Sequence, residues 1–152
     1  KNNPHQKEKM REEVDVSAGD LLDFNIPNGQ ISEAGMRLNI NVGLQYLDAW
    51  LRGSGAVGIY NLMEDAATAE ICRSQLWQWI HHPSASLSDG RKISKHLYQQ
   101  FLMEELEKIK ALYGPQAYTD SKIDSAIELF NALVSSKQFA EFLTLSAYEK
   151  LE

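Results

Sequence analysis

Cysteine, basic side chains and long apolar runs are what this sequence has least of. Cys72 is the only cysteine among 152 residues, which excludes an internal disulfide framework and favours a reducing compartment. Fifteen Lys and Arg stand against 21 Asp and Glu, and the net charge of −6 disfavours binding to a nucleic-acid backbone. No apolar run reaches the roughly 18 residues of a membrane span, so we expect no membrane insertion.

The ends of the sequence carry no targeting signal. It begins Lys1-Asn2-Asn3-Pro4, with neither an initiator methionine nor an apolar signal region. It ends without the Ser-Lys-Leu tripeptide of peroxisomal import. We therefore expect a piece of a longer polypeptide that resides in the cytoplasm.

The composition and the apolar periodicity are those of one helical domain. Hydrophobic residues make up 43% and charged residues 24%, which is ordinary for a globular protein with a single core. Apolar residues recur at helical spacing in four main segments, and the tail predicts one or two short helices. No segment convincingly resembles a strand, so the predicted fold class is all-α, a helical bundle. The main segments cover residues 33–52, 62–82, 95–113 and 122–135.

The first of these helices is predicted to be the central one. Ser32 suits its N-cap, and Gly53 suits a left-handed residue just past its end. Two neighbouring apolar stripes leave only a narrow polar face, and a helix apolar over most of its circumference packs on two sides. The polar face carries Arg37, Asn41, Gln45, Asp48 and Arg52.

Start and stop signals flank the other helices. Asn61 and Glu64 have the spacing of a capping box for the second helix. Ser94 suits the N-cap of the third helix, which Gly114 and Pro115 should end. Residues 1–30 form a polar linker arm with one apolar cluster, which we expect to dock on a neighbouring surface. The cluster consists of Leu21, Leu22, Phe24 and Ile26, and it closes on the turn Pro27-Asn28-Gly29.

Few residues could carry chemistry, and most have a structural explanation. None of the four histidines has the spacing of a zinc-binding helix, and adjacent His81 and His82 point about 100° apart, so no metal site is predicted. Cys72 is predicted to be a small buried side chain. Glu64 and Asp65 form the one dense acidic pair. The helix dipole alone would account for two carboxylates at a helix start, whereas catalysis would also need a cleft and an acidic substrate proton. The residues alone leave both interpretations open.

Several segments resemble the C-terminal domain of malate synthase, and most closely that of the shorter A-type enzymes. The longest is Asn-Leu-Met-Glu-Asp-Ala-Ala-Thr-Ala-Glu-Ile at 61–71, continuing to Gln-Leu-Trp-Gln-Trp-Ile-His-His at 75–82. The resemblance extends from about residue 30 to the end, and its other segments are residues 40–46, 50–53 and 142–145. Ahead of the long segment the family often has Cys and Pro, in a loop near its acyl-CoA cleft. This chain has Ala56 and Gly58 there.

The resemblance implies a fold, a reaction and a set of site residues. Family enzymes are acyltransferases of the glyoxylate cycle, built as a TIM barrel with a C-terminal helical plug. They condense acetyl-CoA with glyoxylate and water to give malate and CoA, using Mg²⁺ held by carboxylates of the barrel. Residues 31–152 would be the plug, residues 1–30 the linker from a barrel that this chain lacks, and the chain alone should be inactive. Asp65 would be the general base and proton donor, and Met63 and Glu64 substrate-binding residues. The alternative is a non-catalytic helical interaction module whose acidic helix start is only a cap.

Overall fold

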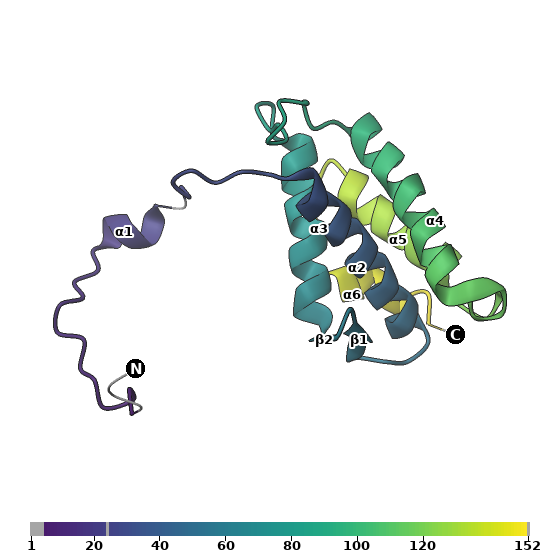
Figure 1. The fold of residues 1–152 in the computed structure, drawn as a ribbon, viewed down its shortest axis with the longest axis horizontal. Helices are drawn as coiled ribbons and strands as arrows, with labels where there is room; N and C mark the ends of the chain where they lie inside the picture. Colours follow the sequence, from purple (N-terminus) through teal and green to yellow (C-terminus); the bar gives the residue numbers. More distant parts are fainter. Residues whose placement is uncertain (1–4, 24, 152) are drawn as a thin grey trace.

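Helix α2, which spans Glu33–Leu51, lies in the middle of the structure, and α3, α4, α5 and strand β1 all contact it (Figure 1). The computed structural model describes residues 5–23 and 25–151. The elements in chain order are α1 (Ala18–Leu22), α2 (Glu33–Leu51), β1 (Val57–Ile59), β2 (Leu62–Glu64), α3 (Ala66–His81), α4 (Lys95–Thr119), α5 (Ile123–Ser135) and α6 (Leu143–Tyr148). The all-α prediction is confirmed, apart from one small hairpin.

The predicted helix signals at α2 and α4 are confirmed. The Ser32 hydroxyl accepts a hydrogen bond from the Gly35 N–H at 3.0 Å, and the Ser94 hydroxyl accepts one from the Leu97 N–H at 3.2 Å. Gly53, just beyond α2, has a left-handed φ of 93°. Gly114 breaks the helical path of α4 at φ 72°, and residues 115–119 then add a last turn that the sequence did not predict.

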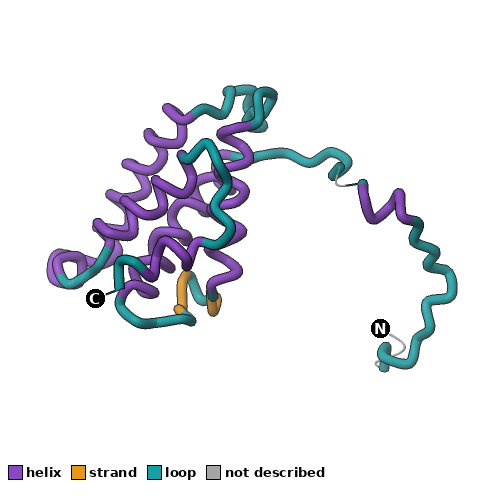
Figure 2. The backbone as a smooth tube through the Cα atoms, turned by 180° about the vertical axis from the view of Figure 1, so that it is seen from behind, coloured by secondary structure: helices purple, strands orange, loops and turns teal. Residues whose placement is uncertain are grey.

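The predicted start of the second helix is wrong, because residues 57–64 form an antiparallel hairpin (Figure 2). Helix α3 begins at Ala66 and not near Leu62. Asn61, expected to cap that helix, lies instead in the hairpin turn with φ 64°, beside Tyr60 with φ 50°. Two consecutive left-handed residues match the two-residue turns that suit the twist of a hairpin. Strands of three residues are too short to show an alternating pattern in the sequence.

The predicted polar face of α2 lies largely inside the protein. Asp48 has no exposed surface, and its carboxylate accepts hydrogen bonds from the Tyr113 hydroxyl at 2.9 Å and the Lys122 N–H at 2.7 Å. Asn41, also buried, donates from its amide nitrogen to Glu105 Oε2 at 2.9 Å. These bonds satisfy the buried polar groups, and they join α2 to α4 and to the start of α5.

Residues 5–23 of the N-terminal arm lie away from the bundle (Figures 1 and 2). Leu21, Leu22 and Ile26 are each more than three-quarters exposed, so the described part of the chain leaves them uncovered, and docking of this cluster on a neighbouring surface stays a prediction. Phe24, the fourth member of the cluster, lies outside the described residues. Within residues 5–23 and 25–151, no helix has the length and apolar character needed to cross a bilayer.

Candidate active site

Asp65 stands at the junction between strand β2 and helix α3. It is the N-cap residue of α3, and its Oδ1 accepts hydrogen bonds from the backbone N–H groups of Ala67 at 2.9 Å and Thr68 at 3.2 Å. These donors are among those that a helix leaves unpaired in its first turn, and they fix the side chain in one orientation. The carboxylate is therefore held firmly although the residue is exposed.

The second carboxylate oxygen of Asp65, Oδ2, has no hydrogen-bond partner among the described residues. Both hydrogen bonds that Asp65 accepts from the described part of the chain end on Oδ1, so no described residue occupies Oδ2. An anchored, exposed carboxylate with one unoccupied oxygen can accept a proton from a bound molecule. Its negative charge also reaches Tyr46, where it adds to burial in raising the pKa of the phenol.

Glu64 precedes Asp65 but has a different environment. It is the last residue of β2, where it pairs with Val57, so it does not belong to the first turn of the helix as the sequence suggested. Its Oε2 accepts a hydrogen bond from the Thr68 hydroxyl at 2.7 Å, and the residue is half-buried. Burial, and then the charge of Glu64, raise the pKa of the Cys72 thiol to about 12. Cys72 is buried, as predicted.

The hairpin presents apolar side chains next to Asp65. Met63 is 76% exposed, which excludes a core position for it, and Tyr60 and Leu62 are more than half exposed. Tyr60 anchors the turn, since its hydroxyl donates to the Asn41 side-chain oxygen on α2 at 2.8 Å. The base candidate thus stands beside an exposed apolar surface carried by a hairpin with a fixed attachment.

Ala56 directly precedes this hairpin, and Gly58 lies within its first strand, β1. Both are exposed, and a Cβ placed on Gly58 would meet no atom within 4 Å. Gly58 borders a cavity of about 260 Å³. Other residues that line this cavity include Arg52, just after the C-terminal end of α2, and Tyr113 on α4. Both positions where the sequence departs from the malate synthase pattern are therefore exposed, and Gly58 has room for a side chain.

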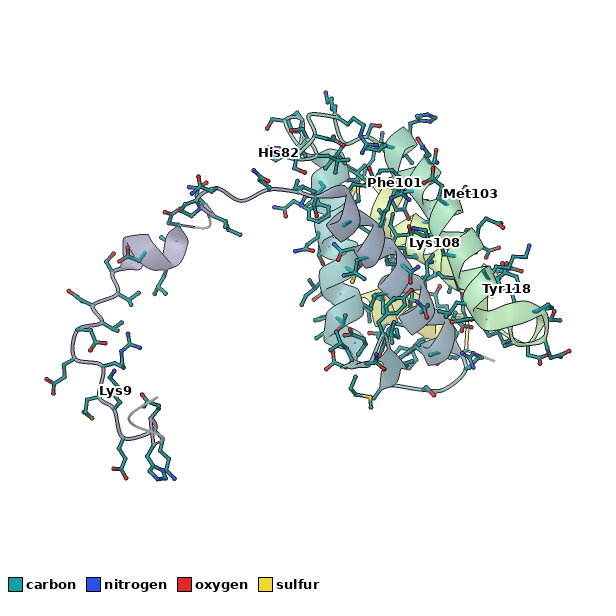
Figure 3. The ribbon with its side chains drawn as sticks, viewed as in Figure 1. Lys9, His82, Phe101, Met103, Lys108 and Tyr118 are labelled. Carbon is teal, nitrogen blue, oxygen red and sulfur yellow. The ribbon has the colours of Figure 1, made fainter. Side chains whose placement is uncertain are left out.

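The described residues do not assemble a metal site. No group of three or more His, Cys, Asp or Glu side chains comes together anywhere in residues 5–23 and 25–151. His81 Nδ1 lies 2.8 Å from the Trp77 carbonyl oxygen, whereas His82 Nδ1 lies 3.1 Å from the Ser84 hydroxyl. His82 follows the C-terminal end of α3, the end remote from Asp65 (Figure 3).

Sequence reasoning missed Thr68 as a member of this site. Thr68 meets both acidic residues, through its N–H to Asp65 and its hydroxyl to Glu64. Its position three residues after the N-cap gives the signal for the first of these bonds. The second bond could not be expected while Glu64 was assigned to the helix, because it depends on the strand geometry.

Comparison with known proteins gives one consistent result. Residues 30–151 match the family described as "Malate synthase, C-terminal". The chain is 46% identical over 149 residues to malate synthase of Myxococcus xanthus (strain DK1622), covering 98% of this chain and 27% of that protein. It is 43% identical to malate synthase A of Escherichia coli (strain K12), covering 97% and 27%, and 42% identical to the glyoxysomal malate synthase of Brassica napus, covering 99% and 27%. The chain thus spans about a quarter of the length of these relatives.

Proposed function

The chain belongs to the malate synthase family, and we propose that it is the C-terminal helical domain of an enzyme that condenses acetyl-CoA with glyoxylate and water. The products are malate and CoA, which makes the complete enzyme an acyltransferase of the glyoxylate cycle. Residues 31–152 are the domain, and residues 1–30 are the linker from a TIM barrel, a fold that needs about 250 residues of its own. The 27% coverage of the relatives leaves ample length for such a barrel.

Asp65 is the general base and proton donor in this proposal. The observation that carries it is the geometry of the carboxylate: Oδ1 is held by two backbone N–H groups, while Oδ2 accepts no hydrogen bond from a described residue and belongs to an exposed side chain. Oδ2 takes a proton from the acetyl methyl group, and fixed positive charge from the barrel stabilises the resulting enolate. The enolate carbon then attacks the glyoxylate aldehyde, and the protonated Asp65 gives its proton to the aldehyde oxygen. Water then hydrolyses the thioester of malyl-CoA and releases malate and CoA.

The neighbouring side chains shape the substrate surface. Met63, which is exposed beside Asp65, lies in the wall that faces acetyl-CoA. Glu64 has Oε1 left for a substrate contact, since Oε2 accepts the Thr68 hydrogen bond. Mg²⁺ would be held by carboxylates of the barrel, and the chemistry that it would supply there is polarisation of the glyoxylate aldehyde.

The test is Asp65→Asn in a full-length enzyme that contains this chain. Asparagine is as good an N-cap as aspartate, so the fold should survive with a loss of about 0.3–1 kcal/mol from the helix dipole. Loss of a general base should lower kcat by roughly 10²–10⁴-fold, while glyoxylate binding stays nearly constant. The rate is measured as deuterium exchange into the acetyl-CoA methyl group and as CoA release.

Glu64→Gln is the matched control, because it neutralises the adjacent carboxylate and keeps its shape. Glu64→Gln should lower kcat much less than Asp65→Asn does. Near-normal exchange in Asp65→Asn would refute the assignment of the base. The isolated chain should release no CoA above background, and measurable turnover by it would contradict the need for a barrel.

A further inference from the structure

Thr68 donates a hydrogen bond to each of the two adjacent carboxylates, one from its backbone and one from its side chain. Its backbone N–H donates to Asp65 Oδ1 at 3.2 Å, which any residue at this helix position could do. Its hydroxyl donates to Glu64 Oε2 at 2.7 Å, which needs a Ser or Thr side chain. The hydroxyl is therefore the specific feature at this position, and its partner is the acidic residue that we have not assigned as the base.

The hydroxyl determines where the Glu64 charge lies. Glu64 is drawn along the side of α3 toward Thr68, and its charge acts on Cys72, one turn further along the helix. The charge of Asp65 acts instead on Tyr46, on helix α2. Two carboxylates that are neighbours in sequence thus face different parts of the structure. If Glu64 were free, its position next to Asp65 would let its charge approach Oδ2 of Asp65.

We propose that Thr68 is a positioning residue, whose hydroxyl holds Glu64 Oε2 against helix α3 and so leaves Asp65 as the sole base at the acetyl methyl group, while Glu64 Oε1 contacts another part of the substrate. The proposal rests on the proposed function, because it concerns how that base is kept distinct from its neighbour. Thr68 itself touches no reacting atom. Its effect is exerted through Glu64, which keeps a second negative charge away from the site where an enolate forms.

Two substitutions separate the hydroxyl from the rest of the side chain. Thr68→Val has nearly the same volume and keeps the N–H that caps Asp65, but it removes the bond to Glu64. Thr68→Ser keeps the hydroxyl and removes only a methyl group. A misplacement of about 1 Å in an active site can cost about 100-fold, so loss of this one side-chain bond should lower the methyl exchange rate roughly 10-fold in Thr68→Val. Thr68→Ser should restore most of that rate.

The decisive experiment is a double-mutant cycle in the full-length enzyme, with kcat and the glyoxylate KM measured for each variant. Thr68→Val should lower kcat and leave KM for glyoxylate unchanged. In a Glu64→Gln background, where the charge is gone, the same substitution should change kcat by less than about 2-fold, the scatter found for independent sites. Equal losses in both backgrounds would overturn the proposal, because Thr68 would then act without the Glu64 charge.

Other outcomes are equally informative. A normal rate in Thr68→Val, or a loss that Thr68→Ser shares, also overturns the positioning role. Failure of Thr68→Val to fold would make the hydroxyl a structural requirement and would count against it too. Asp65→Asn is run in parallel: if it stays active, the proposed function fails, whereas an inactive Asp65→Asn with a normal Thr68→Val refutes the positioning role alone.

Discussion

Replacing Gly43 by alanine would place a methyl group against the ring of Phe130, where helices α2 and α5 meet. An ideal Cβ on Gly43 lies 2.6 Å from both Cε2 and Cζ of that ring. Carbon atoms pack best at about 3.5–4.0 Å, so the ring or the helix would have to move by roughly 1 Å. Phe130 has no exposed surface, and the surrounding core leaves it little room to turn away.

The expected cost follows from two opposing effects. Overpacking a filled core costs about 1–3 kcal/mol, and contact with two ring atoms of a fully buried side chain points to the upper part of that range. Alanine in place of glycine within a helix stabilises the folded state by about 1 kcal/mol, because alanine has the higher helix propensity. The net loss in the free energy of unfolding should therefore be about 2 kcal/mol. For a domain of this size that corresponds to a fall in Tm of roughly 4–8 °C.

Urea denaturation and thermal melting of the 152-residue chain, followed by circular dichroism, measure this loss. Gly58→Ala is the control, since a Cβ there meets nothing within 4 Å, and it should change stability by less than about 0.5 kcal/mol. Combining Gly43→Ala with Phe130→Leu should cost less than the sum of the two single changes. A Gly43→Ala protein as stable as the parent, or more stable, would refute the packing argument.

Two further predictions concern buried groups. Burial raises the pKa of the Cys72 thiol from about 9 to about 12, so iodoacetamide at pH 8 should modify Cys72 only after unfolding. The contribution of this shift to the free energy of unfolding should be complete below about pH 9 and lost as pH rises toward 12. Rapid alkylation of the folded chain, or urea midpoints unchanged in Cys72→Ala relative to the parent across that interval, would contradict this. Asp48→Ala should cost roughly 3 kcal/mol in urea melts, because it removes the acceptor of the Tyr113 hydroxyl and the Lys122 N–H, and Asp48→Asn should cost less. Equal stability of Asp48→Ala and the parent would show that these bonds contribute nothing.

The sequence predicted the helices well because their signals are local. Ser32, Ser94 and Gly114 each act within a few residues, so a cap or a break can be recognised without knowing what packs against the helix. The buried polar face of α2 could not be predicted in the same way. Asp48 is satisfied by groups from residues 113 and 122, and only the folded chain brings them together.

The hairpin and the site beside it were harder to predict. Tyr60 and Asn61 form the turn, and neither is a glycine. The glycine-containing pair that usually indicates a two-residue hairpin turn is therefore missing from the sequence. Asp65 was singled out by resemblance and not by chemistry, because an acidic helix start has an ordinary structural explanation. The Asp65 and Glu64 side chains have different environments because strand β2 ends at Glu64 and helix α3 begins just after Asp65. The hydrogen bond from Thr68 to Glu64 depends on the same geometry.

The central position of α2 has a consequence during synthesis of the chain, because some of its packing partners are made much later. The Lys122 N–H that contacts Asp48 follows it by 74 residues, and most of α5 emerges later still. At a synthesis rate of roughly 5–20 residues per second, α2 leaves the ribosome about 4–15 s before these partners exist. During that interval α3 and α4 can already cover part of α2, but the apolar surface of α2 that packs against α5 stays uncovered. The nascent chain should therefore be a substrate for ribosome-associated chaperones until residues 123–135 have emerged.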